Sequence, residues 1–251
     1  DWYLGQLKEA IENSKSDRNQ IKARKDLNTF IDSQDDYNQA PEAEKEIFRR
    51  GTTQNSYYDA SGNLIRTVYT AYFDTGQLKS TDDYRYSSGV LTTRYYKLYD
   101  TAGALIQNLT QTYYSNGKVN TSTDYRYALG VTTAYYFNQY DANGVRLRYL
   151  TQTYYSNGKV NTSYDYWYDS LGVITAYYLN QYDTTGVHLR YLKQSYYSNG
   201  KVNASYDYRY DNLGVLTTQY YNQYDSDGYR IRSLTQTYYS NGKVNTSTDY
   251  R

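Results

Sequence analysis

The chain contains 251 residues, with a formal net charge of +1, no Cys, no Met, one Pro, one His and 40 Tyr. Without Cys there is no disulfide framework and no thiolate metal site, and one His is too few for a histidine-based metal cluster. The small net charge argues against nucleic acid as a partner, and no apolar run approaches the ~20 residues of a membrane-spanning helix. We therefore expect no cofactor, no metal, no nucleic acid and no membrane insertion.

The hydrophobic residues are themselves unusual. The mean hydropathy is −0.95. Hydrophobic residues make up 39% of the chain, and 40 of these residues are Tyr. Tyr combines an apolar ring with a polar tip, so this composition argues against a thick aliphatic core. A natural reading frame begins with Met, so a chain without Met is expected to be a segment of a longer array.

Residues 1–51 differ in composition from the rest of the chain. They contain every Glu and the only Pro, but just 2 of the 40 Tyr. Leu4, Leu7 and Ile11 recur at helical spacing, and Pro41 suits the first turn of a helix. We expect this block to be a small helical cap or preceding module, with a partner-binding helical module as the alternative.

Residues 52–251 form a repeat that is punctuated by glycine. Fourteen Gly follow one another at spacings of 13 or 14 residues, from Gly62 to Gly242, and several are preceded by Asn. Asn-Gly between β-prone segments is typical of a hairpin turn, because both residues tolerate a positive φ. The strand-and-turn units come in three kinds, which gives a long period of 41 or 42 residues.

The segments between the turns alternate in residue type, which predicts β-strands. In Lys118–Tyr127, for example, Val, Thr and Tyr alternate with Lys, Asn, Ser, Asp and Arg. We expect a mainly β protein, an elongated antiparallel meander of about fourteen strands braced by cross-strand Tyr pairs. Curving the Val, Leu, Thr and Tyr face inward would bury a thin axial core and give a β-solenoid-like array. An open single-layered sheet is the alternative.

Three short motifs resemble known repeat families. Tyr113–Val119 is similar to the core of variant MORN repeats, and Tyr140–Val145 resembles YD repeats. The cluster Tyr135–Phe137 ahead of Asp141–Gly144 is similar to glucan-binding repeats of Gram-positive surface proteins. The resemblance covers residues 57–251 and implies an extracellular, repetitive protein of the bacterial cell surface, often adhesive.

No catalytic motif is present, so we expect no enzyme. His188 is Arg in the neighbouring copies, which indicates a tolerated surface variant. Asp225–Gly228 is similar to a calcium loop, but its copies keep only the first Asp and the Gly, which favours a turn. Asp82 and Asp83 are adjacent in a predicted strand, so they should point to opposite faces and cannot form an acid–base pair.

The Tyr array is the positive functional signal. Exposed Tyr with Asn, Asp and Arg between them suit sugar rings, which stack on aromatic side chains and hydrogen-bond to amides, and they also suit protein contacts. Trp167 stands where two other copies have Arg, so we expect it to be an exposed aromatic on the polar face. The candidate ligand-binding residues are Trp167, Tyr136, Tyr178, Tyr221, Arg126 and Arg209.

These features favour a non-catalytic repeat segment of a bacterial cell-surface adhesin or stalk, located outside the cell. Its expected partners are glycans or host surface molecules. Two alternatives stay open at this point, namely the carbohydrate-binding tail of a secreted glycan-processing enzyme and a purely structural spacer.

Overall fold

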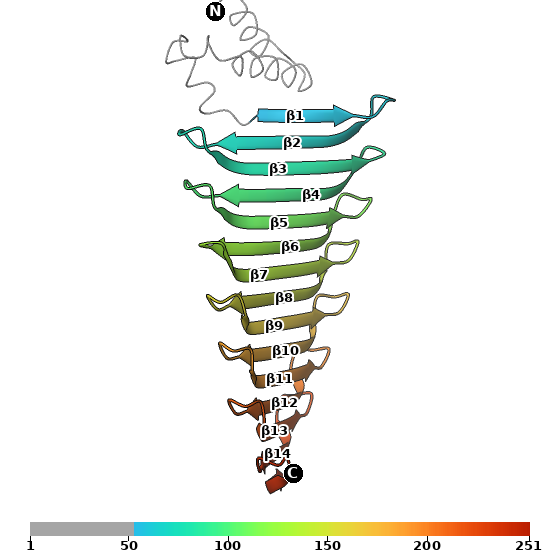
Figure 1. Ribbon diagram of the computed structural model, residues 1–251. Helices are drawn as coiled ribbons and strands as arrows, with labels where there is room; N and C mark the ends of the chain where they lie inside the picture. The colour runs from blue at the N-terminus through green and yellow to red at the C-terminus, as the bar shows by residue number, and fades with distance from the viewer. Residues whose placement is uncertain (1–52) are drawn as a thin grey trace, which may run out of the picture. The chain divides into compact units, whose positions relative to one another are not determined.

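The computed structural model describes residues 53–251, and all of their regular structure is antiparallel β-sheet (Figure 1). The helices predicted for residues 1–51 lie outside the described residues. The fifteen strands are β1 (Thr53–Tyr58), β2 (Leu64–Tyr72), β3 (Leu78–Ser87), β4 (Val90–Tyr99), β5 (Leu105–Tyr113), β6 (Val119–Ala128), β7 (Val131–Tyr140), β8 (Arg146–Tyr154), β9 (Val160–Tyr168), β10 (Ile174–Tyr182), β11 (His188–Tyr196), β12 (Val202–Tyr210), β13 (Leu216–Tyr224), β14 (Arg230–Tyr238) and β15 (Val244–Tyr250).

The chain divides into two compact units, with the boundary inside β5 between Thr110 and Gln111. The part described of unit 1 is residues 53–110, and unit 2 is residues 111–251. Within each unit, neighbouring strands in the sheet are consecutive in the sequence and are joined by tight hairpins. Each unit is therefore an antiparallel meander, as the alternation of residue types predicts.

Glycine and Asp together form the turns that the sequence predicts. In the β7–β8 turn, Oδ1 of Asp141 accepts hydrogen bonds from the backbone N–H groups of Asn143 and Val145, both at 2.8 Å. Gly144 follows with φ of 87°. Such a three-residue loop, a turn closed by a left-handed Gly, is a common hairpin connection, and the local Asp side chain stabilises it.

A shorter turn explains why the period is 41 residues in one copy and 42 in the next. The β6–β7 hairpin closes through two residues, Leu129 and Gly130, with φ values of 51° and 78°. A turn with two positive φ values matches the right-handed twist of the strands. The corresponding β9–β10 hairpin contains one more residue, because Asp169 is added and only Gly172 has a positive φ.

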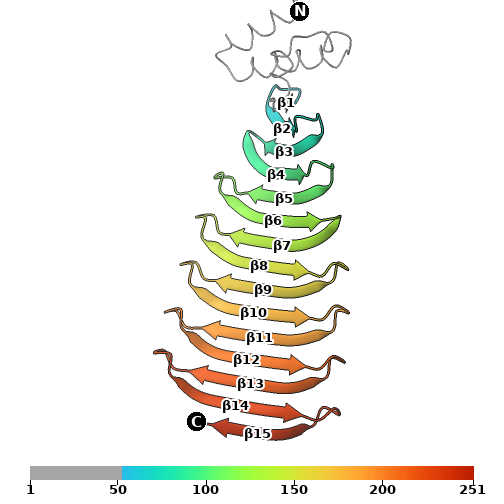
Figure 2. The same cartoon turned by 90° about the vertical axis from the view of Figure 1, so that its left-hand side faces the viewer.

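The hairpins from β1 to β4 and from β6 to β15 also contain a β-bulge close to the turn. The register between β9 and β10, for example, shifts between Ile174 and Ala176, which leaves Thr175 without a partner residue. The Thr175 hydroxyl instead donates a hydrogen bond of 3.2 Å to the carbonyl of Trp167. Bulges increase the local twist of a strand pair, and in unit 2 the later strands are seen along their length in Figure 2 but nearly end-on in Figure 1.

Each copy in unit 2 contains three strands. Because this number is odd, equivalent side chains of successive copies point to opposite faces of the sheet. Directly opposed residues of an antiparallel pair point to the same face. Asp165 on β9 is opposed by Tyr178 on β10. Tyr178 is opposed by Lys193 on β11, which is opposed by Tyr206 on β12. The copy of Asp165 on β12 is Asp207, the neighbour of Tyr206, so it points to the other face.

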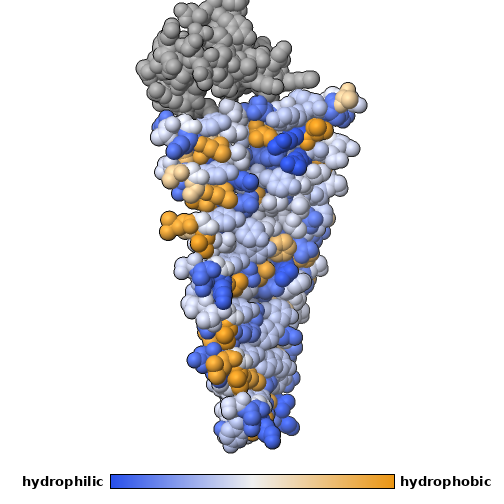
Figure 3. All heavy atoms as spheres, in the orientation of Figure 1, coloured by the Kyte–Doolittle hydropathy of each residue, from blue (hydrophilic) through white to orange (hydrophobic). Residues whose placement is uncertain are grey.

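Successive copies in unit 2 therefore exchange faces, and no face collects the apolar residues. Among residues 53–251, Leu179 is the only buried hydrophobic side chain, with 6% exposed. Figure 3 accordingly shows scattered hydrophobic residues among pale and hydrophilic ones. The prediction of a thin axial core in a β-solenoid-like coil was wrong, because an odd number of strands per copy distributes each residue type over both faces. Each unit is an open meander.

Tyr clusters take the place of an aliphatic core, and they contain the cross-strand Tyr pairs that the sequence predicts. On one face of unit 2, the ring of Tyr166 lies 6.0 Å from that of Tyr149 and 4.8 Å from that of Tyr177. Burial, with Tyr166 and Tyr164 nearby, raises the pKa of Tyr177 to about 12. Tyr177 is therefore neutral at physiological pH, and the three rings pack across three strands.

Candidate functional site

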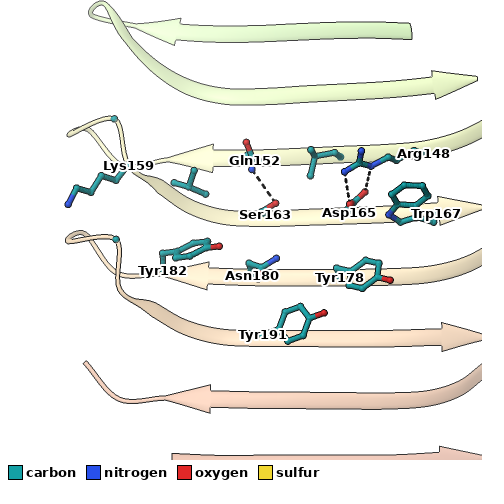
Figure 4. Close-up of a pocket in the computed structure, with 14 residues that line it drawn as sticks. Arg148, Gln152, Lys159, Ser163, Asp165, Trp167, Tyr178, Asn180, Tyr182 and Tyr191 are labelled. Carbon is teal, nitrogen blue, oxygen red and sulfur yellow. Dashed lines mark hydrogen bonds and ion pairs between the residues drawn. The ribbon is translucent and has the colours of Figure 1, made fainter. Parts of the chain in front are cut away.

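A concavity of unit 2 lies on the face opposite this Tyr cluster and has a volume of about 850 Å³. We call it the Trp167 groove. It crosses β8, β9, β10 and β11, and Figure 4 shows its side chains. Its lining includes Arg148 and Gln152 on β8, Ser163, Asp165 and Trp167 on β9, Tyr178, Asn180 and Tyr182 on β10, Tyr191 on β11, and Lys159 in the β8–β9 turn.

A charged pair holds the aromatic platform at one end of the groove. Arg148 donates two hydrogen bonds to Asp165, from Nε to Oδ1 and from Nη2 to Oδ2, both at 2.9 Å. These bonds raise the pKa of Arg148. The Arg148 guanidinium also lies 4.6 Å from the centre of the Trp167 ring, a cation–π contact. Trp167 still exposes 40% of its surface, so it is available to a ligand.

Neutral polar groups and further rings line the rest of the groove. Tyr178, Asn180 and Tyr182 follow one another along β10, beside the Arg148–Asp165 pair (Figure 4). The amide of Gln152 donates a hydrogen bond of 3.4 Å to the Ser163 hydroxyl. The groove therefore alternates aromatic faces with amides and hydroxyls.

The far end of the groove is fixed by bonds between two turns. In the β8–β9 turn, the Tyr155 hydroxyl donates to the carbonyl of Tyr182 at 2.8 Å. Asn157 donates to the carbonyl of Thr184 at 2.7 Å, and the Lys159 ammonium donates to the carbonyl of Thr185. These three bonds fasten the β8–β9 turn to the β10–β11 turn, so the end of the groove is preformed.

The six residues predicted to bind ligand do not form one site. Trp167 and Tyr178 both line the Trp167 groove. Arg126 and Tyr136 lie near each other on the opposite face of unit 2, where Arg126 pairs with Asp124 at 2.9 Å.

The remaining two predicted residues, Arg209 and Tyr221, lie on opposite faces of unit 2, and neither lines the Trp167 groove. Arg209 lies on the same face as Arg126 and pairs with Asp207 at 3.3 Å. Tyr221 points to the groove face, where its ring lies 4.7 Å from that of Tyr206. The copy of Tyr178 is Tyr220, and Tyr221 is the copy of Leu179. The prediction of Tyr221 was therefore one residue out of register with Tyr178.

The sequence interpretation missed Arg148, Asp165 and Lys159. A signal for the first two was present, because three copies have an Asp with Arg 17 residues before it, as in the pairs of Arg190 with Asp207 and Arg232 with Asp249. Only the strand register shows that this spacing places the two charges side by side.

The two adjacent carboxylates of unit 1 behave as predicted. Asp83 bonds to Nε of Arg66 at 2.9 Å. Asp82 is opposed by Tyr69 and Tyr96, lies on the other face, and bonds to Arg94 at 2.8 Å. Each carboxylate is thus part of its own ion pair, and the two cannot act together as acid and base.

The turn at Asp225–Gly228 is also confirmed. Oδ1 of Asp225 accepts hydrogen bonds from the backbone N–H groups of Asp227 and Tyr229, at 3.0 and 2.9 Å. This carboxylate stabilises the turn. Within residues 53–251, no group of three or more His, Cys, Asp or Glu could hold a metal ion.

His188 is more enclosed than a surface variant. Its ring stacks between Tyr182 and Tyr210, with centroid distances of 4.9 and 5.1 Å. Burial lowers the pKa of His188, and its Nε2 has no hydrogen-bond partner in the described part of the chain. It packs as a neutral ring.

Comparisons with known proteins give no family. No protein-family model matches the chain, and no curated protein matches it either. Solved structures that resemble it include TcdB2-TccC3-Cdc42, with 14% identity over 73% of this chain and 13% of that chain, at a TM-score of 0.20. A porin-like protein from Bacteroides uniformis has 12% identity over 78% of this chain and 91% of that chain, also at 0.20.

A Bacteroides fragilis protein of unknown function has 12% identity over 79% of this chain and 92% of that chain, at a TM-score of 0.14. At these scores the similarities carry no argument about function. In residues 53–251 there is no helix long and apolar enough to cross a membrane.

Proposed function

We propose that the repeats are a non-catalytic carbohydrate-binding segment of an extracellular adhesin or stalk of the bacterial cell surface. The observation that carries this proposal is the exposed Trp167 ring, which is held by the Arg148–Asp165 pair beside Tyr178 and Asn180. A pyranose ring can stack on the indole while its hydroxyls bond to the amides and phenols around it.

The charges of the groove indicate a neutral sugar. Arg148 and Asp165 satisfy each other through two hydrogen bonds, and the Lys159 ammonium is bonded to a backbone carbonyl. Because Arg148 and Asp165 neutralise each other, the lining residues carry a net charge of +1 from Lys159, which attracts a polyanion weakly. The hydroxyls of a neutral polymer need only donors and acceptors at the surface. A neutral glucan is therefore the ligand class that the groove fits best.

The test is binding to a glycan array, followed by calorimetric titration with soluble neutral glucans such as dextran and laminarin. Trp167→Ala should weaken binding about tenfold or more, because a central aromatic anchor carries much of the energy of such a site. Tyr239→Ala is the matched control, since this exposed Tyr lies in the β14–β15 turn outside the groove. No binding to any polysaccharide would overturn the proposal and favour a spacer. Full binding by Trp167→Ala would overturn the Trp167 groove as the binding site.

A further inference from the structure

Unit 2 contains a second concavity that is built from the same positions one copy earlier. It has a volume of about 410 Å³ and is lined by Gln111, Gly117, Lys118, Ser122, Tyr140 and Gly144, among others. Each of these residues has a copy in the Trp167 groove, for example Ser163 for Ser122 and Lys159 for Lys118. We call this concavity the Lys118 groove.

The strand register places the two grooves on opposite faces. Ser122 is opposed by Asn138 on β7, and Asn138 by Tyr149 on β8. Tyr149 is opposed by Tyr166 on β9, so Ser122 and Tyr166 share a face. Trp167 follows Tyr166 along the strand and therefore points the other way. The odd number of strands in each copy thus turns the same groove from one face to the other.

The turn end of the Lys118 groove is preformed in the same way. The Tyr114 hydroxyl donates to the carbonyl of Tyr140 at 2.8 Å, and Asn116 donates to the carbonyl of Ala142 at 2.7 Å. The Lys118 ammonium donates to the carbonyl of Asn143 at 2.6 Å. These bonds reproduce those of Tyr155, Asn157 and Lys159, so both grooves offer a ligand the same rigid end.

Two substitutions separate the copies that form the two grooves. At the first, Gln107 stands where the later copy has Arg148. At the second, Arg126 stands in the place of Trp167 and pairs with Asp124 at 2.9 Å. The Lys118 groove therefore lacks the indole platform, which agrees with its smaller volume. It should bind the same neutral sugar polymer less tightly than the Trp167 groove does.

We infer that unit 2 binds neutral polysaccharide on both faces at once and so bridges two polymer chains. This inference rests on the proposed function of the Trp167 groove and adds a second site, in the Lys118 groove, on the opposite face. Two sites on one rigid sheet convert weak single contacts into multivalent binding, provided that both can be occupied together.

The experiment is isothermal titration of the whole chain with short neutral gluco-oligosaccharides, combined with the turbidity of dextran mixtures. The wild type should bind at least two molar equivalents and should make dextran solutions turbid. Trp167→Ala should lose the tighter equivalent, while Tyr140→Ser should lose a weaker one and keep the tighter. Both variants should give less turbidity.

A gain-of-function variant keeps the inference testable even if Tyr140→Ser folds poorly. Arg126→Trp supplies the missing platform, and it should raise the affinity of the weaker site severalfold without changing the number of sites. A single equivalent in the wild type, with binding abolished by Trp167→Ala, would overturn the two-faced arrangement and leave the proposed function intact. A complete absence of binding by the wild type would overturn the proposed function, and this inference with it.

Discussion

The β2–β3 turn of unit 1 and the β8–β9 turn of unit 2 are the same hairpin with different side chains. In unit 2, Tyr155, Asn157 and Lys159 each donate a hydrogen bond to a carbonyl of the β10–β11 turn. The corresponding residues of unit 1 are Phe73, Thr75 and Gln77.

Within residues 53–110, the contacts of these unit 1 side chains are local. The Lys79 ammonium lies 5.8 Å from the centre of the Phe73 ring, and the Thr75 hydroxyl bonds to Gln77 at 3.5 Å. Both hairpins form, so the bonds between turns are not needed for the sheet. In unit 2 the bonds between turns instead shape one end of the Trp167 groove.

In the middle of the strands the two units are alike, because both contain the same Arg–Asp ion pair. In unit 1, Asp83 is 8% exposed and bonds to Arg66 at 2.9 Å. In unit 2, Asp207 is 9% exposed and bonds to Arg190 at 2.8 Å. The Arg–Asp ion pair is thus common to both units, whereas the side-chain bonds between turns are found in unit 2.

Loss of the shared ion pair should have the largest effect. Asp207→Ala leaves the half-buried Arg190 without its acceptor, and Asp83→Ala does the same to Arg66, so each should cost about 1–3 kcal/mol of unfolding free energy. Urea denaturation followed by far-UV circular dichroism measures the change. Asp74→Ala, in the exposed β2–β3 turn, is the control and should stay within about 0.5 kcal/mol. If the buried and exposed variants lost the same stability, the ion pairs would not be what holds the strands together.

Replacement of the unit 2 turn by that of unit 1 should have an intermediate effect. The triple change Tyr155→Phe, Asn157→Thr and Lys159→Gln removes three bonds between turns, two of them exposed, at a cost of about 1–2 kcal/mol in total. It should also speed amide exchange in the β10–β11 turn.

The β14–β15 turn provides the matched control for this change. Tyr239, Asn241 and Lys243 occupy the same positions, and Asn241 makes the same local bond to the N–H of Lys243, at 3.0 Å. No bond from these side chains to another turn occurs among the described residues. The same triple change there should therefore cost only the local bond, and an equal loss at both turns would contradict the role of the contacts between turns.

The local features of the fold could be predicted from the sequence. The spacing of the glycines determines the turns, because a left-handed backbone position and an Asp or Asn side chain act within five residues. The opposite orientation of Asp82 and Asp83 follows from the two-residue period of a strand in the same way.

The composition of the site could not be predicted in the same way. Which residues share a face depends on the register across several strands, and a shift of one residue reverses every side chain. Tyr178 and Tyr221 illustrate this, since they occupy different positions within their copies and yet point to the same face, because successive copies exchange faces. The Arg148–Asp165 contact likewise exists only after β8 and β9 have paired.

The smallest effect is expected at a second pair of turns, which repeats the comparison inside unit 2. Leu129 has φ of 51° and its side chain is fully exposed, whereas its copy Leu171 has no positive φ. Asn tolerates the left-handed region better than Leu does, so Leu129→Asn should raise the unfolding free energy by about 0.5–1 kcal/mol without loss of packing. Leu171→Asn should not, because its backbone carries no such strain. An equal gain from both changes in urea denaturation would mean that removal of an exposed Leu, rather than relief of the left-handed backbone, stabilises the turn.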